Sequence, residues 1–165
     1  MKTEQKERQV RKEGEKHVLF ELQRTFFGIH ILEVSEILSD IHITPVPQAS
    51  SYTAGMMTVR GEPIVVIDLR KRLGMVPKEN DVKTRIIVLK EKEGERLGLL
   101  VDGVKEIITI EKANMREPGA LIEKIGIKKE ILIGVSILEK EPIFILDVSR
   151  VIGSEPNEMP KKQAI

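Results

Sequence analysis

The chain contains the same short element twice, and this duplication limits what it can fold into. The stretch EPIVVIDLRKRLG occupies residues 62–74, and EPIFILDVSRVIG occupies residues 141–153. Each copy begins with Glu-Pro-Ile, continues through branched apolar residues to an aspartate, and closes with a short amphipathic stretch and a glycine. Proline is tolerated at the first position of a strand, and the apolar run after it is typical of a buried strand. The pattern therefore predicts a strand followed by a short helix in both places.

The aspartates and glycines of the two copies have a mechanical explanation. Asp68 and Asp147 stand just before the amphipathic stretches, where a carboxylate can accept hydrogen bonds from the first backbone N–H groups of a helix. Gly74 and Gly153 stand where a helix can end in a left-handed conformation. We therefore predict that the aspartates are helix caps rather than a general acid and base, since no histidine or serine at useful spacing accompanies either.

A second internal match lies outside this element. GIHILEVSEI at residues 28–37 resembles GLLVDGVKEI at residues 98–107. Each half of the chain therefore contains a hairpin, a V-x-E-I segment and a further hairpin that ends in the doubled element. Continuous apolar runs such as IVVI and GLLV indicate strands that are buried on both faces. We predict an all-β fold with a few short helices, built from two five-stranded antiparallel β-barrels packed side by side as a pseudo-repeat.

Short strands and tight turns are expected to make up most of the body. Hairpin turns are predicted at Arg24–Thr25, Gly61, Glu93–Gly94 and Glu139–Lys140. Residues 32–38 have helical spacing. The stretch SSYTAGMM at residues 50–57 is expected to contain a helical turn that ends at Gly55. Residues 39–44 are expected to form an extended strand, which the following prolines stop.

The two ends of the chain are expected to lie outside the folded body. Residues 1–16 are charged and lack periodicity, and residues 153–165 contain prolines, so both are predicted to be flexible tails around a domain at residues 17–152. The N-terminal stretch has no apolar segment of a secretory signal, and no part of the chain approaches the roughly 18 apolar residues of a membrane span. We therefore expect a cytoplasmic protein with no direct membrane insertion.

Composition excludes several classes of function. The chain has no cysteine, which excludes disulfides, thiolate metal sites and thiol catalysis. Its net charge of +1 and its aromatic content of 3% provide neither the basic surface nor the stacking platform of a nucleic-acid-binding protein. No nucleic-acid partner is therefore expected.

The sequence also lacks a credible catalytic or metal-binding motif. The histidines occur singly and outside any metal-like spacing: His17, His30 and His42. Gly55 and Gly61 flank MMTVR without the lysine and hydroxyl residue of a phosphate-binding loop. The basic run Arg70–Arg72 is expected to form the solvated face of a small helix. We therefore expect no enzymatic activity, no metal and no cofactor, as in a binding or assembly module.

The stretch PVPQASSYTAGMMTVRGEPIVVIDLRKRLG at residues 45–74 resembles the CheW family of bacterial chemotaxis coupling proteins. The family shows a proline-containing extended segment, a G-[VI]-x-N-[LV]-R-G turn and an apolar strand that ends in D-L. Here the turn is GMMTVRG at residues 55–61, with Thr58 in place of the usual asparagine. FGIHILEVSEI and GLLVDGVKEI are similar to two further family segments, so the resemblance extends from Phe20 to Ile152.

The resemblance implies two five-stranded SH3-like barrels and a role without catalysis. Family members bridge the cytoplasmic tips of methyl-accepting chemoreceptors to the regulatory domain of the CheA histidine kinase, in receptor arrays at the inner membrane. The receptor tip is a helical hairpin, and a groove between the two barrels would suit it. The implied receptor-binding residues are Leu32, Val34, Glu36, Gly55 and Arg60. The implied kinase contacts are Ile41 and Ile43, with a second contact at Arg116 and Leu121.

Other functions are compatible with parts of the same pattern. A CheW-like regulatory or adaptor module of another two-component pathway would carry the same motifs. An unrelated all-β binding module, such as an oligonucleotide-binding barrel, predicts a basic groove with aromatic residues. A small hydrolase would place Asp68 or Asp147 in a pocket. Without the resemblance, Arg60 would be read as a surface arginine in a turn, and Ile41 and Ile43 as buried strand residues.

Overall fold

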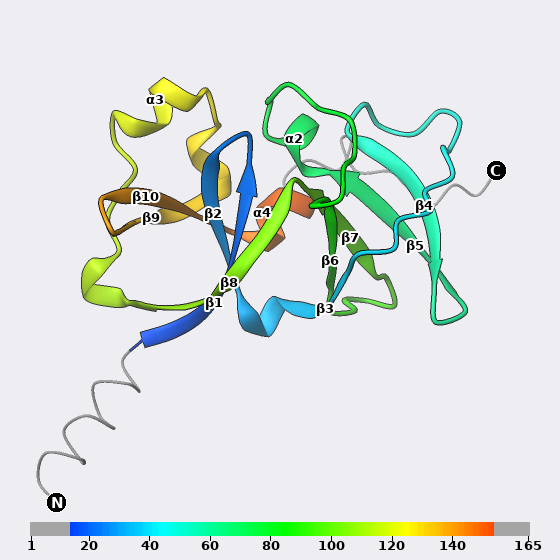
Figure 1. The fold of residues 1–165 in the computed structure, drawn as a ribbon, viewed down its shortest axis with the longest axis horizontal. Helices are drawn as coiled ribbons and strands as arrows, with labels where there is room; N and C mark the ends of the chain where they lie inside the picture. The colour runs from blue at the N-terminus through cyan, green and yellow to red at the C-terminus, as the bar shows by residue number, and fades with distance from the viewer. Residues whose placement is uncertain (1–13, 154–165) are drawn as a thin grey trace, which may run out of the picture.

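The computed structural model describes residues 14–153 of the chain. These residues form two five-stranded sheets that lie side by side (Figure 1). Sheet 1 consists of β3 (Val34–Leu38), β4 (Thr53–Val59), β5 (Glu62–Asp68), β6 (Arg85–Leu89) and β7 (Leu97–Val101). Sheet 2 consists of β1 (Gly14–Leu22), β2 (Thr25–His30), β8 (Gly103–Glu111), β9 (Leu132–Leu138) and β10 (Glu141–Leu146). The short helices are η1 (Ile31–Glu33), α2 (Leu69–Arg72), η2 (Lys112–Asn114), α3 (Leu121–Ile125), η3 (Lys129–Ile131) and α4 (Val148–Gly153).

The two sheets repeat each other strand by strand, but each contains strands from both halves of the chain. The strand orders are β3-β6-β7-β5-β4 and β8-β1-β2-β10-β9, so every strand of one sheet has an equivalent five places away in the chain. The hairpin β1–β2 is inserted between β8 and β10, and the hairpin β6–β7 is inserted between β3 and β5. The predicted fold class of two five-stranded units is confirmed, and the two halves of the chain have exchanged hairpins.

Each sheet contains one parallel pair, so the expectation of purely antiparallel barrels is wrong in this detail. β2 runs parallel to β10, and β5 runs parallel to β7. Gly28 lies opposite Ile145 and Gly98 lies opposite Val66 in these two pairs. A Cβ atom on Gly28 would lie 2.8 Å from Ile145 Cδ1, which explains why a glycine recurs at the same place in the two matching segments.

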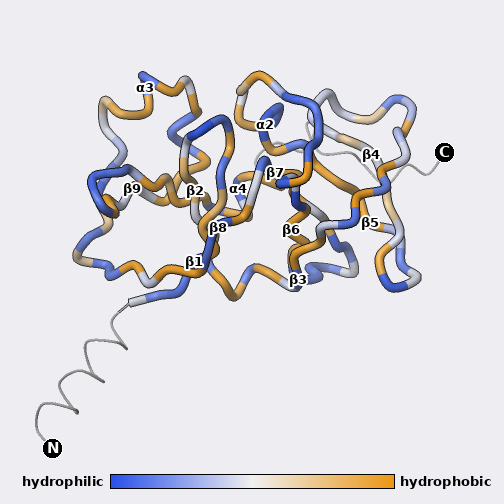
Figure 2. Tube along the Cα trace, in the orientation of Figure 1, coloured by the Kyte–Doolittle hydropathy of each residue, from blue (hydrophilic) through white to orange (hydrophobic). Residues whose placement is uncertain are grey.

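Apolar side chains form one core between the sheets and a smaller core within each sheet. The core between the sheets includes Phe20, Phe27 and Phe144, whose ring centroids are 5.8 and 5.9 Å apart in successive pairs. Every residue of β7 is buried, with Leu99 in the core between the sheets and Leu100 in the core of sheet 1. The prediction that such runs are buried on both faces is confirmed. Figure 2 shows apolar residues along most of the strands and hydrophilic residues at the β4–β5 turn.

Several local predictions are wrong because pairing between distant strands overrides local spacing. Residues 34–38 form β3 beside β6, and only Ile31–Glu33 are helical. Residues 53–59 form β4 rather than a helical turn. Residues 39–44 are not a regular strand, since Thr44 makes a single bridge to Met56. Gly153 is the last residue of α4 and has no left-handed φ.

The ends of the folded part differ slightly from the predicted limits. β1 begins at Gly14, within the predicted N-terminal tail, and α4 ends at Gly153. Residues 1–13 and 154–165 of the predicted tails lie outside the described residues.

The predicted aspartate caps are present, but the basic run Arg70–Arg72, directly after Asp68, is not a solvated helix face. Asp68 accepts hydrogen bonds from Arg70 N and Lys71 N at the start of α2, and Gly74 follows with a φ of 78°. Arg70 and Arg72 are only 2% and 8% exposed. Figure 1 shows α2 close to the line where the sheets meet, which a short run of letters in the sequence does not reveal.

The side chain of Arg70 connects three parts of the chain. Its Nε donates to Asp68 Oδ1 at 3.0 Å, and its Nη1 donates to Asp102 Oδ1 at 3.0 Å and to the Lys78 carbonyl at 2.8 Å. Asp102 also accepts from the backbone N–H of Gln23, in the β1–β2 turn of sheet 2. This buried cluster therefore joins the helix after β5 to the crossover between the sheets and to the exchanged hairpin.

Candidate functional site

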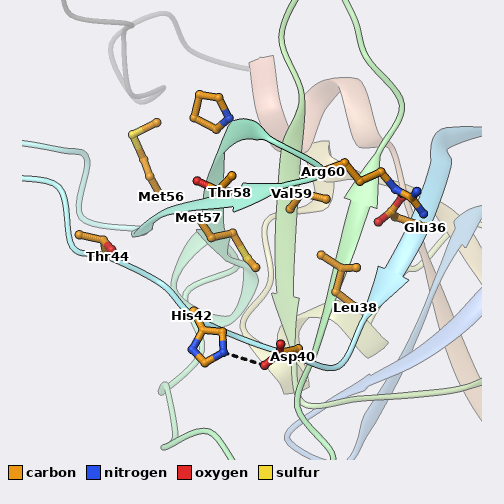
Figure 3. Close-up of a pocket in the computed structure, with 11 residues that line it drawn as sticks. Glu36, Leu38, Asp40, His42, Thr44, Met56, Met57, Thr58, Val59 and Arg60 are labelled. Carbon is orange, nitrogen blue, oxygen red and sulfur yellow. Dashed lines mark hydrogen bonds and ion pairs between the residues drawn. The ribbon is translucent and has the colours of Figure 1, made fainter.

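An open groove of about 590 Å³ crosses sheet 1 between β3, residues 40–44 and the β4–β5 hairpin (Figure 3). Its apolar lining includes Leu38, Met56, Met57 and Val59. Methionine side chains are flexible and polarisable, so they can adapt to more than one apolar partner. The groove lies on sheet 1, whereas the space between the sheets, where a receptor groove was expected, is filled by the central core.

One end of the groove is formed by Glu36 and Arg60, which are 24 residues apart in the sequence. Arg60 Nε donates to Glu36 Oε2 at 3.0 Å, and the Arg60 side chain is 75% exposed. Arg60 and Gly61 have φ angles of 52° and 81°, consecutive left-handed values that produce the tight type I′ turn of a hairpin. An exposed ion pair contributes little to stability. The turn therefore holds a guanidinium at the rim, where its remaining nitrogens face solvent.

The other end of the groove is also polar. His42 Nε2 lies 2.8 Å from Asp40 Oδ1, and both side chains are exposed. Figure 3 shows Leu38 and Met57 between this pair and the Glu36–Arg60 pair. The arrangement is an apolar floor with a charged pair at each end, which suits an amphipathic protein segment rather than a small molecule.

Leu32 and Val34 lie beyond the Glu36 end of the groove, on η1 and β3. Leu32 is 67% exposed, and Val34 is half-buried against the central core. His30 holds the start of η1 because its Nδ1 accepts the Leu32 backbone N–H at 3.1 Å, while its Nε2 lies 3.3 Å from Glu15 Oε2. The side chain of Leu32 is thus presented outward on a capped turn.

Gly55 is buried, and its predicted role as a helix stop is wrong. It sits at a register shift in β4, has a φ of 148°, and lies beneath Thr44. A Cβ atom at this position would be 2.2 Å from the Thr44 carbonyl oxygen. Gly55 therefore influences the surface through the course of the segment above it, and direct contact with a receptor stays a prediction.

The residues predicted to contact a kinase lie on different sheets. Ile41 and Ile43 are half-buried and pack against the core of sheet 1. Arg116 is exposed and bridges to Val135 at the edge of sheet 2, and Leu121, the first residue of α3, is 37% exposed. The two predicted contacts are therefore separate surfaces.

The surroundings of the ionisable residues singled out in the sequence are those of residues that support the fold. Asp147 accepts from Ser149 Oγ at 2.6 Å and from Arg150 N at 3.3 Å, as a helix cap does. His17 is 3% exposed, and burial in sheet 2 lowers its pKa. Residues 14–153 contain no group of three or more His, Cys, Asp or Glu side chains arranged to hold a metal ion.

No helix in the part of the chain that the structure describes is long and apolar enough to cross a membrane.

Sequence reasoning missed two methionines of this surface and one buried contact elsewhere in the fold. The helical turn predicted to end at Gly55 leaves Met56 and Met57 without a strand assignment and hides their place in the groove, although their position just before the T-V-R-G turn is a signal for a strand. The buried contact between Arg70 and Asp102 has no local signal, since the two residues lie 32 positions apart.

The comparisons with known proteins agree on one family. The family model described as CheW-like domain matches residues 16–155. The chemotaxis protein CheW of Rhizobium meliloti is 27% identical over 145 residues, which cover 88% of this chain and 92% of that protein. The chemotaxis protein CheW of Bacillus subtilis is 27% identical over 150 residues, covering 89% and 92%. The crystal structure of the scaffolding protein TtCheW from Thermoanaerobacter tengcongensis superposes with a TM-score of 0.78 at 29% identity, covering 88% of this chain and 97% of that one.

Proposed function

The chain belongs to the CheW family of chemotaxis coupling proteins, and we propose that it bridges the cytoplasmic tips of chemoreceptors to the regulatory domain of a CheA-type histidine kinase. Family members are adaptors and scaffolds rather than catalysts. The observation that carries the proposal is the exposed Glu36–Arg60 pair, which a rigid turn presents at the end of an apolar groove. We place the protein in the cytoplasm, in receptor arrays at the inner membrane.

The receptor-binding surface comprises Arg60 and Glu36 at the rim, with Leu32 and Val34 beside them. A guanidinium that uses one nitrogen for Glu36 keeps further donors for carboxylates or carbonyl oxygens of a helical tip. The exposed Leu32 adds apolar contact, which helical partners use in grooves of this kind. Gly55 contributes by shaping the adjacent segment around Thr44.

The kinase-binding surfaces are the segment with Ile41 and Ile43 on sheet 1 and the segment with Arg116 and Leu121 on sheet 2. Because these two surfaces are separate, one chain could contact two kinase molecules at once. Coordinated contacts of this sort increase the effective concentration of each partner for the next binding event.

A charge reversal at Arg60 tests the receptor surface. Arg60→Glu puts a carboxylate beside Glu36, so binding to a purified receptor-tip fragment should weaken by at least about tenfold, the loss expected at a binding hot spot. The matched control is Arg24→Glu, an exposed arginine in the left-handed β1–β2 turn of sheet 2, with a φ of 66°. Calorimetric titration gives the affinities, and thermal unfolding checks that both variants are folded.

The outcomes separate the proposed function from its alternatives. If Arg60→Glu and Arg24→Glu bind the receptor fragment equally well, the receptor surface is wrongly placed. If the unaltered chain binds neither the receptor fragment nor the kinase regulatory domain, the proposed bridging function is wrong. Unfolding of Arg60→Glu alone would make Arg60 a structural residue.

A further inference from the structure

Two short segments outside the strands are attached to the sheets in the same way. Thr44 and Met56 exchange two backbone hydrogen bonds of 2.8 Å at β4. Arg116 and Val135 exchange two of 2.9 and 2.8 Å at β9. β4 and β9 occupy the same edge position in the two strand orders. Each sheet therefore carries one segment outside its strands, around Thr44 in sheet 1 and around Arg116 in sheet 2, that a single bridge fixes to its edge strand. We call these two segments the covering segments.

A glycine lies directly beneath each bridge. Gly55 precedes Met56, and Gly134 precedes Val135. A Cβ atom on Gly134 would lie 2.8 Å from the Arg116 carbonyl oxygen and 2.9 Å from Met115 Cγ. Both distances are shorter than Cβ contacts in folded proteins, so the segment would have to move. Gly134, unlike Gly55, has no left-handed φ, so the requirement at this position is one of space alone.

The residue before each bridge is an apolar anchor. Ile43 packs against the core of sheet 1, and Met115 packs against the core of sheet 2. Glycine, bridge and anchor thus recur together in the two sheets. Both covering segments also carry residues of the kinase surfaces proposed above, Ile41 and Ile43 on one and Arg116 on the other.

We propose that Gly134 is a positioning residue that holds Met115 and Arg116 against β9 and so builds the second kinase-docking surface; Gly55 has the equivalent place beneath Thr44 in sheet 1. The proposal rests on the proposed function for the identity of the partner, but the seating itself is a property of the free chain. Gly134 is buried beneath the covering segment. It acts by allowing the covering segment to approach the strand closely enough for both hydrogen bonds.

The first experiment measures, with no partner present, whether the covering segment stays hydrogen-bonded to β9. In Gly134→Ala, backbone amide hydrogen exchange at Arg116 and Val135 should become at least about tenfold faster, because their mutual hydrogen bonds lengthen or break. The matched control is Gly103→Ala, a strand glycine of the same sheet whose added Cβ would lie an ordinary 3.6 Å from the Lys83 carbonyl oxygen. Unchanged exchange at both amides in Gly134→Ala overturns the proposal.

The second experiment asks whether Gly134 acts through Arg116. Binding of the kinase regulatory domain is measured for Gly134→Ala, Arg116→Ala and the double variant, in a chain that also carries Ile41→Ala to weaken the first surface. Each single change should weaken binding by about tenfold, and the double variant should be no weaker than either, since both remove the same contact.

Each outcome of this cycle decides a different point. Additive losses, or binding of Gly134→Ala equal to that of Gly103→Ala, would show that Gly134 does not position Arg116 for the kinase. No effect of Arg116→Ala would remove the second kinase surface from the proposed function, and the exchange measurement would still decide whether Gly134 seats the segment.

Discussion

Arginine side chains serve opposite purposes in two places of this protein. Arg60 is 75% exposed and makes one ion pair at the rim of the groove, whereas Arg70 is 2% exposed and pairs with Asp68 and Asp102. Exposed pairs contribute little to stability, but a buried charge that loses its partner is costly. The first arginine is therefore available for binding, and the second holds the fold.

Replacing each arginine by alanine should distinguish the exposed arginine from the one that holds the fold. Arg70→Ala leaves two buried carboxylates unpaired and should lower the free energy of unfolding by about 3–5 kcal/mol. Arg60→Ala should change it by less than about 1 kcal/mol. Denaturant unfolding of both variants measures the difference, and equal losses would contradict the assignment of Arg70 as structural.

His17 should make stability depend on pH. Burial disfavours its charged form and lowers its pKa from 6.5, opposed by its hydrogen bond to the Glu15 carbonyl and assisted by the nearby His30. Because the pKa is lower in the folded state, this contribution is fully present above pH 6.5 and is lost as the pH falls through the folded-state pKa. The free energy of unfolding should therefore decrease as the pH falls below 6.5.

A substitution taken from the other sheet tests this. His17 pairs with His30 two residues beyond Gly28, where sheet 1 has the apolar pair Ile86 and Leu100 two residues beyond Gly98. In His17→Ile, the fall in unfolding free energy below pH 6.5 should be smaller than in the unaltered chain. His42→Gln, a change at an exposed histidine, should leave it unchanged, and a full pH dependence in His17→Ile would exclude His17 as its source.

Helices and turns could be predicted where their signals are local, and strands could not where pairing is distant. The turns at Arg60–Gly61 and Glu139–Lys140 and the cap of α2 by Asp68 are confirmed, because each depends on residues within a few positions. β3 was mistaken for a helix because its pairing with β6, from Leu38 to Ile86, is invisible in a short window. The same holds for the site: Glu36 on β3 and Arg60 after β4 meet because sheet 1 brings its two opposite edges together, which no short window of sequence shows.

The two helix caps should differ in strength. Asp147 caps α4 and is half-buried, so Asp147→Ala should cost about 1 kcal/mol of unfolding free energy and leave partner binding intact. Asp68→Ala should cost clearly more, about 3 kcal/mol or above, because it also leaves Arg70 without one of its buried partners. Urea unfolding compares the two, and a large binding defect in Asp147→Ala would reveal a functional role for that aspartate.

The molecule as a whole is held together by exchanged hairpins as well as by its central core. The internal matches predicted two similar units correctly, but they could not show which hairpin joins which sheet, because both hairpins have apolar strands. The cluster of Arg70, Asp68 and Asp102 adds a buried link between the sheets. Sheet 1 is formed by the consecutive strands β3 to β7, whereas sheet 2 joins β1 and β2, which precede them in the chain, to β8, β9 and β10, which follow them.

We therefore expect one cooperative unfolding transition. The calorimetric enthalpy should equal the van't Hoff enthalpy, and probes in the two sheets should report the same midpoint. Arg70→Ala should lower the midpoint for both sheets together. Two separate transitions, or a midpoint that shifts for sheet 1 alone, would mean that the sheets are independent domains.

The exchange of hairpins also bears on how such a chain could arise. A peptide of half the length would carry one hairpin and three further strands, and in the present arrangement that hairpin lies in the sheet of the other half's strands. Two identical copies would complete each other by swapping hairpins, as domain-swapped dimers do. The present chain has the geometry of such a swapped dimer, with both copies joined in one polypeptide.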